Sequence, residues 1–557
     1  MIFGIDQNCH PLWDPAPKLA ALAAGGATLR QYIEDVDAAF STPGAEVGDD
    51  TLQLARERYH RGGGADWGAA LFYTGFLGRV PIDVRAFEGP TGMKLAALAR
   101  NLPAREGDGI GRSVDDLYDE FSPGDNWQLI GSSYAGDRDH HRTLADLSVR
   151  EVEPMLRELL DKAEADMRRR FPAQTSQRRL NVWFGEQRQR VDGLLRRHAA
   201  GRLTDLYADW LAAAVPDGVE IAIASDLFAC GADAGQRELL NVFVRDYDQA
   251  AGLYNEALAE SDVALRPLDT ERGELPMFAT FDRDGRNVRA AMSAKAGEVK
   301  IAERTFALTA DGALPFKQMA EAGVAAVTGK AVLLVIQARV GRAGAPLALP
   351  YRGSVYVPAS HVLTDKLAGA GLLPDKPHPI LRVRFHLLER LAKVDVPIHL
   401  PEHVAAAAGE PELPARRLAE AWAALREEAR VRLRMFADDE ARSRWQRERF
   451  ADIFEELEPL NSRRREMARR DPKSPEIRRA SKRARRLEAN LLNATVRQID
   501  RDMQMAEMDF YDSRGALRPW CIALGGHDFY DEVLRRCEFH VEDPSGRCLP
   551  CDVPRTQ

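Results

Sequence analysis

The sequence lacks any long apolar stretch. No run in its 557 residues approaches the roughly 18 consecutive apolar residues that a membrane-spanning helix needs. The opening residues, MIFGIDQNCHPLWDPAPK, also lack the basic start and apolar middle of a signal peptide. These absences exclude a membrane-spanning helix and lead us to expect a cytoplasmic protein with no membrane partner.

Cysteine is scarce as well, with six in the whole chain. So few cysteines in so long a chain exclude the disulfide framework of a small secreted domain. In a reducing compartment they are expected to be free thiols or metal ligands.

Recognisable phosphate-binding motifs are also missing. The Gly-rich segment RGGGADWG at 61–68 could present backbone N–H groups to a phosphate, but it matches neither a P-loop nor a dinucleotide-binding fingerprint. The short motifs therefore name no reaction.

The composition is that of a folded globular protein, with 45% apolar and 29% charged residues. A chain of this length exceeds what one hydrophobic core usually organises, so two or three structural units are expected. The first of these, residues 1–405, is predicted to be an α/β body. Its expected elements are a helical segment at 147–214, buried strands at 219–228 and 331–340, and a β-meander at 275–310.

Residues 406–515 are predicted to form a long antiparallel coiled-coil hairpin. Apolar residues in its second arm recur at alternating steps of three and four, as in a coiled-coil seam: Ala489, Leu492, Val496, Ile499, Met503, Ala506 and Phe510. Pro472 and Pro475 cannot continue a helix interior, so the arms are expected to turn back near 471–475.

The predicted hairpin tip, residues 462–486, is strongly basic. It holds twelve Lys and Arg against three Asp and Glu, which gives it a charge of +9 and leaves −17 for the rest of the chain. Such a patch favours a polyanion, either nucleic acid or an acidic protein surface. The candidate contacts are Arg478, Arg479, Lys482 and Arg483. The alternative is a solvated basic tip without a partner.

Residues 516–557 are expected to be a short C-terminal tail with a possible zinc site. Cys537 and His540 form one pair with a spacing of three, and Cys548 and Cys551 form another. Three cysteines and one histidine could fill the tetrahedron of a structural zinc ion. The alternative is a loose tail in which these side chains are free.

Two loops carry candidate residues for chemistry. Asp139, His140 and His141 could supply acid–base catalysis, because a carboxylate can orient an imidazole that titrates near neutrality. The alternative is a polar loop that caps the next helix. Arg352, Ser354 and His361 follow a predicted strand and could bind an anionic substrate, although a plain surface role for Arg352 stays open.

The order of these elements resembles that of the cysteine-adding enzymes (cysteine ligases) of bacillithiol biosynthesis. The resemblance covers about residues 220–515: the segment YNEALAESDVALRP, the β-meander, the segment PYRGSVYVPASH and the C-terminal hairpin. It implies a bacterial enzyme with a Rossmann-like body and a coiled coil, which joins an amino acid to an amino-sugar conjugate. The paired glycines expected in that family's late loop are absent from RGSVYVPASH.

We therefore expect a transferase or ligase that acts on a small anionic or nucleotide-like substrate. The competing hypothesis is a non-catalytic adaptor that binds nucleic acid or a ribonucleoprotein through the basic tip.

Overall fold

The computed structural model describes residues 1–6, 9–12, 15–37, 40–41, 84–103, 112–113, 117, 133–134, 141–261, 265–354, 356–471, 474–512 and 517–549. The chain divides into two compact units. Unit 1 comprises residues 1–76, 127–390 and 510–557, and unit 2 comprises residues 77–126 and 391–509. No helix among the described residues is long and apolar enough to cross a membrane.

Unit 1 contains a seven-stranded sheet with the order β17-β16-β13-β12-β1-β2-β6. Its strands are β1 (Ile2–Asp6), β2 (Leu29–Ile33), β6 (Val219–Ile223), β12 (Leu347–Pro350), β13 (Ile380–Arg384), β16 (Glu538–Glu542) and β17 (Cys548–Leu549). The five strands from β13 to β6 in this order run parallel, whereas β16 is antiparallel to β13. The predicted mixed α/β fold is confirmed.

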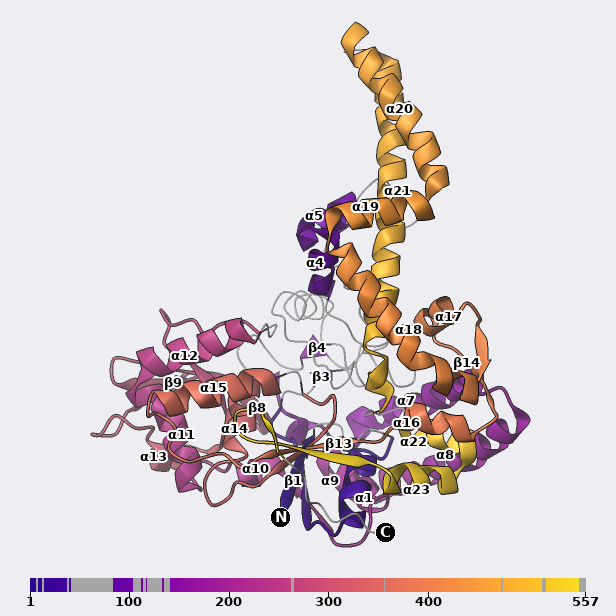
Figure 1. Cartoon of the computed structure of the whole chain (residues 1–557). Coiled ribbons are helices and arrows are strands. Elements are labelled where there is room, and N and C mark those ends of the chain that lie inside the picture. The colour runs from indigo at the N-terminus through magenta and orange to yellow at the C-terminus, as the bar shows by residue number, and fades with distance from the viewer. Residues whose placement is uncertain are drawn as a thin grey trace. The chain divides into compact units, whose positions relative to one another are not determined.

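Helices cover this sheet on both faces. Residues of α10 (Ala224–Leu227), α14 (Ala331–Gln337) and α15 (Val357–Gly369) share one apolar cluster with Phe3, Tyr32 and Leu347 of the sheet. Helices α1 (Pro15–Ala24) and α9 (Leu203–Ala212) pack on strands of the same sheet. Figure 1 labels these elements.

The predicted β-meander is confirmed as a second sheet, with the order β10-β9-β8-β7-β11. Its strands are β7 (Glu274–Arg283), β8 (Arg286–Lys295), β9 (Glu298–Ile301), β10 (Arg304–Ala307) and β11 (Val324–Gly329), and β5 (His141–Arg142) pairs with β8. Asp284 and Gly285 both have positive φ, as do Ala296 and Gly297. This is the backbone that a two-residue turn needs to match the twist of its strands.

The remaining elements of unit 1 are mostly helices. They are η3 (Leu144–Asp146), α7 (Val149–Arg170), α8 (Gln174–Arg197), α11 (Ala234–Arg245), α12 (Tyr247–Glu260), α13 (Phe316–Glu321), α16 (Leu387–Arg390), α22 (Leu517–Gly525) and α23 (His527–Arg535), together with the two short strands β3 (Phe40–Ser41) and β4 (Ser133–Tyr134). The predicted helical segment at 147–214 is confirmed. Ser148 and Glu151 form a capping box at its start, and Pro172 follows the end of α7.

The strand predicted at 331–340 is wrong, because this run forms helix α14. Val332, Leu333, Val335 and Ile336 are all buried. A short run that is buried all round has no amphipathic period, so its pattern cannot separate a helix from a strand. The strand lies just before it, as β11. The strand predicted at 219–228 is confirmed for 219–223, after which α10 begins.

Unit 2 is largely a helical hairpin, drawn from orange to yellow in Figure 1. Its elements are η1 (Val84–Phe87), α4 (Glu88–Thr91), α5 (Leu95–Asn101), η4 (Leu391–Lys393), β14 (Pro397–His399), α17 (Glu402–Ala408), β15 (Glu412–Pro414), α18 (Ala415–Phe436), α19 (Asp439–Arg449), α20 (Ala451–Arg470) and α21 (Pro475–Ala506). The short helix η5 (Met508–Asp512) follows α21 and crosses the division between the units.

The two arms of the hairpin run in opposite directions. Arg432 pairs with Asp502, whereas Arg483, near the start of α21, pairs with Glu456. The turn lies between the end of α20 at Arg470 and the start of α21 at Pro475, as predicted. Leu457, Ala484 and Leu487 form a small core between the two arms.

The unit boundaries differ from those expected at 405 and 515. Residues 391–405 belong to unit 2, where β14 pairs with β15. The C-terminal segment belongs to unit 1, because β16 completes the large sheet through five residue pairs with β13.

Candidate active site

The carboxyl ends of the parallel strands form the edge at which open α/β sheets usually bind ligands. The chain order of the strands reverses between β1 and β12, since β2 and β6 lie on one side and β12 and β13 on the other. Such a reversal opens a crevice where the loops leave in opposite directions. At this edge β1 ends at Asp6, β12 at Pro350 and β13 at Arg384.

A buried polar cluster lies at the end of β1. Lys18 Nζ is 2.7 Å from Asp6 Oδ2, and Gln31 Nε2 donates a hydrogen bond to the same oxygen over 3.0 Å. Cys9 Sγ donates to the backbone oxygen of Asp6 over 3.0 Å. The Lys18 side chain is 0% exposed, and that of Asp6 is 15% exposed. A buried ammonium is costly unless it is paired, so this arrangement requires the carboxylate.

The local sequence explains how the cluster forms. Gln31 on β2 extends across β1 at Gly4, where an added Cβ would lie 2.0 Å from Gln31 Oε1. Only glycine leaves room for this crossing. Lys18 comes from the first turn of α1, the helix that follows β1, and it is the only charged residue in that helix. A strand, a short loop and a helix therefore bring Asp6 and Lys18 together.

Backbone strain marks the neighbouring strand ends. Among the described residues, five other than glycine have positive φ. Asp284, Ala296 and Ala302 are in turns of the meander. Ser354 and His386, with φ of 54° and 57°, follow β12 and β13 at the carboxyl edge. Strained residues that lie outside tight turns concentrate at functional sites.

The three predicted substrate-binding residues lie on two elements, with Arg352 and Ser354 after β12 and His361 in α15. Arg352 is exposed and Ser354 is partly buried. His361 is buried in α15, where Nδ1 lies 2.8 Å from the Pro544 oxygen and Nε2 lies 3.3 Å from Glu542 Oε2. His361 therefore contacts the C-terminal segment of unit 1.

The predicted acid–base loop lies mostly outside the described residues. Asp139 and His140 are not described, and His141 is placed only by its backbone pairing with Arg289 in β8. The nearby Asp146 accepts a hydrogen bond from the Asn287 N–H over 2.8 Å. This contact attaches the end of the loop to the meander.

Two of the four predicted zinc ligands, Cys537 and Cys548, lie near opposite ends of β16. Cys548 pairs with Glu542 at one end of β16, whereas Cys537 precedes the other end. The five residue steps from Cys537 to Glu542 span about 17 Å at about 3.4 Å per residue in a strand, while zinc ligands lie about 2 Å from the metal. Cys551 lies outside the described residues. No group of three or more His, Cys, Asp or Glu in the described part of the chain is arranged to hold a metal ion.

Burial also changes the chemistry of one of these thiols. Desolvation raises the pKa of Cys537 to about 12. A thiol with a raised pKa forms less of the reactive thiolate, so Cys537 is a weaker nucleophile than an exposed cysteine.

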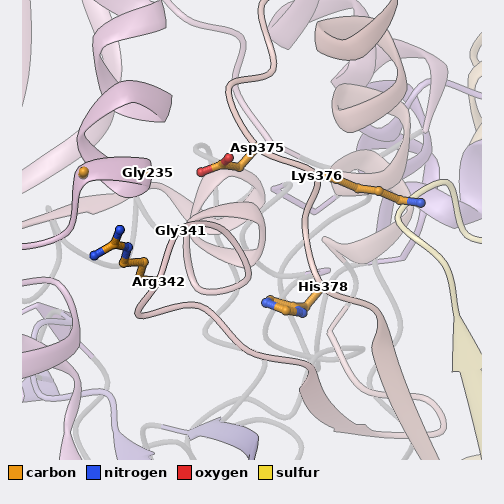
Figure 2. A pocket seen from close by; sticks show the side chains of 7 residues that line it. Gly235, Gly341, Arg342, Asp375, Lys376 and His378 are labelled. Atoms are coloured by element: carbon orange, nitrogen blue, oxygen red, sulfur yellow. The ribbon is translucent and has the colours of Figure 1, made fainter.

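A hollow of about 420 Å³ lies at the opposite edge of the sheet (Figure 2). Its lining includes Gly341, Arg342 and His378, which precede β12 and β13, and Gly235 at the start of α11. Figure 2 shows Lys376 pointing away from the other labelled side chains. Because its charged side chains do not converge, we place the candidate active site at the carboxyl edge instead.

Asp6, Lys18 and Gln31 are not among the residues predicted from the sequence. A weak signal was present, because PAPKLAALAA contains one lysine within an otherwise apolar helix and follows a short apolar run that ends in Asp6. Without the strand order, nothing in the sequence shows that Gln31 reaches the same carboxylate.

No protein-family model, curated protein or solved structure matches this chain.

Proposed function

We propose that unit 1 is a cytoplasmic enzyme of the group-transfer or ligase type, with its active site at the carboxyl edge of the parallel sheet. Its substrate is a small anionic or nucleotide-like molecule. The observation that carries the proposal is the buried pair of Lys18 and Asp6 at the end of β1, next to the point where the strand order reverses.

The contacts of Asp6 support a role in proton transfer. The hydrogen bonds from Lys18 and Gln31 both go to Oδ2. Within the described residues, Oδ1 has no hydrogen-bond donor, and the side chain is partly exposed. In this role Oδ1 accepts the proton of an attacking amine or hydroxyl, while Lys18 holds the carboxylate in place and stabilises negative charge nearby.

The finer description of the fold belongs to the same proposal. Numbered along the chain, the parallel strands β6, β2, β1, β12 and β13 follow the order 3-2-1-4-5, which is that of the Rossmann fold. The hairpin of unit 2 is proposed to pack as a coiled coil. Both features agree with the resemblance to the cysteine-adding enzymes of bacillithiol biosynthesis, so we propose an amino acid and an amino-sugar conjugate as the first substrates to test.

Ligand binding can be tested without a known reaction. Phosphate, pyrophosphate, ADP, ATP, and cysteine with an amino-sugar conjugate should be compared for their effect on the melting temperature of wild type, Lys18→Met and Asp6→Asn. A ligand that stabilises the wild type is expected to lose most of this effect in both variants. Lys317→Met is the control, because Lys317 is 89% exposed in the same unit. Equal stabilisation of all four proteins would contradict the proposal.

A second candidate function is polyanion binding at the hairpin tip. Arg478, Arg479 and Lys482 are exposed, and none of them pairs with a carboxylate among the described residues. Arg483 instead forms two hydrogen bonds with Glu456, of 2.6 and 2.9 Å. Three unpaired cations on one segment of α21 favour contact with phosphates.

This second function predicts a strong dependence on salt. Each phosphate contact contributes roughly 0.7 to 0.9 to the slope of log affinity against log salt. Reversing the charges of Arg478, Arg479 and Lys482 is therefore expected to flatten the slope for single-stranded RNA by about 2, while reversal of the paired Arg483 has a smaller effect. Unchanged binding by the triple variant would exclude the tip.

A further inference from the structure

Three nitrogen-bearing side chains approach one carboxylate where β13 and β16 meet at the carboxyl edge. His386 Nε2 lies 3.0 Å from Glu538 Oε2, and His540 Nε2 lies 3.7 Å from the same oxygen. Arg384 is the residue directly opposite Glu538 in the pairing of the two strands. Glu538 is thus in the position that a bound anion would take.

These nitrogens have more donor capacity than their surroundings use. Arg384 Nε and His540 Nε2 are buried, and neither has a hydrogen-bond acceptor among the described residues. The His386 residue is 8% exposed. Its Nε2 is satisfied by the Glu538 carboxylate, at 3.0 Å. Buried donors without acceptors are rare, and they point to a group that is missing from the site.

Arg384, His386 and His540 are also held in place by contacts with residues other than Glu538. The Arg384 guanidinium stacks over the Tyr351 ring at 5.1 Å, and the Tyr351 and His540 rings are 5.4 Å apart. The His386 ring contacts Glu389 through Nδ1, at 3.3 Å. The strained backbone of His386, with φ of 57°, fixes the position of this ring beyond the end of β13.

The backbone around the site is fixed by a buried carboxylate. Asp512 Oδ1 accepts a hydrogen bond from the Leu388 N–H over 2.8 Å, and the Asp512 backbone oxygen accepts one from the Phe385 N–H over 3.1 Å. A site that is already rigid before the ligand arrives loses little entropy on binding. Glu538, by contrast, is 45% exposed, so its side chain can leave towards solvent.

We infer that Arg384, His386 and His540 bind a tetrahedral oxyanion, such as the phosphate of a phosphate ester, and that the Glu538 carboxylate occupies this site when the anion is absent. A guanidinium fork and two imidazole N–H groups offer donors in several directions, which suits an anion with more than two oxygens. The inference rests on the proposed function, because it assigns the anionic end of the same substrate. β13 is two strands from β1, so the backbones of the two strand ends lie about 10 Å apart at about 4.8 Å per strand.

The test measures binding of inorganic phosphate and of methyl phosphate by calorimetry. Glu538→Gln removes the competing charge, and both ligands are expected to bind about tenfold more tightly. Arg384→Met is expected to weaken both at least tenfold, with Arg384→Lys as a milder variant that keeps the charge. The control is Glu412→Gln, which breaks a comparable His–Glu contact of 3.0 Å to His399 in unit 2 and should leave both affinities unchanged.

The measured affinities either support the oxyanion site or overturn it. Tighter binding by Glu538→Gln together with loss in Arg384→Met supports the site, and preference for methyl phosphate over phosphate identifies an ester as its ligand. Equal affinities of wild type, Glu538→Gln and Glu412→Gln would overturn the inference, as would tighter binding in both glutamine variants. If phosphate binding is absent while another ligand still depends on Lys18 and Asp6, this inference fails and the proposed function stands.

Discussion

At the scale of single residues, Asp512 shows how burial at the carboxyl edge of the sheet changes the pKa of a carboxyl group. Its side chain is 0% exposed. Burial raises the pKa of this carboxyl to about 6, and the backbone N–H of Leu388 and the charge of Arg384 only partly oppose that rise. The nearest cation, Arg384, is 3.8 Å away, which is too far for a hydrogen bond. The folded protein therefore holds a proton on Asp512 more tightly than the unfolded chain does.

This shift predicts a pH dependence of stability with a definite sign. Between about pH 4 and pH 6 the folded state binds more protons at Asp512 than the unfolded state, so its contribution to stability falls as pH rises. A rise in the pKa of this carboxyl from about 4 to about 6 corresponds to at most about 3 kcal/mol. Asp512→Asn keeps an oxygen for the Leu388 N–H and has no proton to lose. We expect its melting temperature, relative to wild type, to rise from pH 4.5 to pH 7.

The comparison depends on the difference between the two proteins, because other groups titrate in the same range. His10 is one of them, since burial lowers its pKa to about 3, and its effect has the opposite sign. That effect is common to wild type and variant and cancels. A constant difference in melting temperature across this range would show that Asp512 does not titrate as the buried geometry requires.

Single residues also show where sequence reasoning stops. The zinc prediction used the spacing of Cys537, His540, Cys548 and Cys551, which is compatible with a metal site only if the chain brings the two pairs together. The chain does turn back after β16, but residues 538–542 extend as a strand, which separates Cys537 from Cys548. The cluster of Asp6, Lys18 and Gln31 could not be predicted, because it depends on which strands are neighbours rather than on spacing along the chain.

At the scale of elements, β16 connects two candidate sites on the late strands of unit 1. Its first residue, Glu538, faces the His386 site, and its last residue, Glu542, contacts two buried side chains of the neighbouring elements. Arg382 Nε donates to Glu542 Oε1 over 3.1 Å, and His361 Nε2 lies 3.3 Å from Oε2. These contacts fix the register of β16 against β13, and therefore the position of Glu538 as well.

We predict that Glu542→Ala loosens this strand. The variant leaves the buried Arg382 with only backbone carbonyl acceptors, the oxygens of Pro350 and Gly353. Removing one partner of a buried pair is strongly destabilising, and because Glu542 is 20% exposed and these acceptors remain, we expect a loss of about 2 kcal/mol. The measurements are the melting temperature and the rate of limited proteolysis in the C-terminal segment.

The matched control is Glu220→Ala. Glu220 pairs with Arg30 at 2.7 Å in the same sheet, but it is 52% exposed. An exposed pair contributes about 0.5 kcal/mol or less. If both variants lose the same stability and the proteolysis rate does not change, the contacts of Glu542 do not hold β16 in place.

Elements that carry a local sequence signal could be predicted from the sequence, and fully buried elements without one could not. The helices at 147–214, the meander and the turn of the hairpin each carry a local signal: a capping box, a two-residue turn and a pair of prolines. Helix α14 carries no such signal, because all its faces are covered by unit 1. The pairing of β16 with β13 joins residues more than 150 positions apart and has no local signature.

At the scale of the whole molecule, the chain leaves unit 1 near residue 390 and returns near residue 510. Between these points it forms the hairpin, whose two small cores lie at different distances along its arms. One contains Phe436, Val496 and Ile499, and the other contains Leu457, Ala484 and Leu487. Because each core lies entirely within unit 2, the outer part of the hairpin can be removed while the inner core stays intact.

Removing the outer part separates the two proposed functions. Glu456 pairs with Arg483 across the arms, so residues 455–484 can be replaced by a short Gly–Ser turn that joins Phe454 to Arg485 in the same register. The deletion removes Arg478, Arg479, Lys482 and Arg483 but leaves Lys18, Asp6 and Arg384 in unit 1. We expect the shortened protein to keep the affinity of wild type for phosphate and to lose most of its binding to RNA at low salt.

The control for the shortened protein is the full-length variant with the three charge reversals at Arg478, Arg479 and Lys482. If the proposals are correct, the two variants lose RNA binding to the same extent, because phosphate contacts rather than hairpin length determine it. Loss of phosphate binding in the shortened protein would contradict the placement of the oxyanion site in unit 1. RNA binding that survives both changes would place the polyanion site elsewhere in the chain.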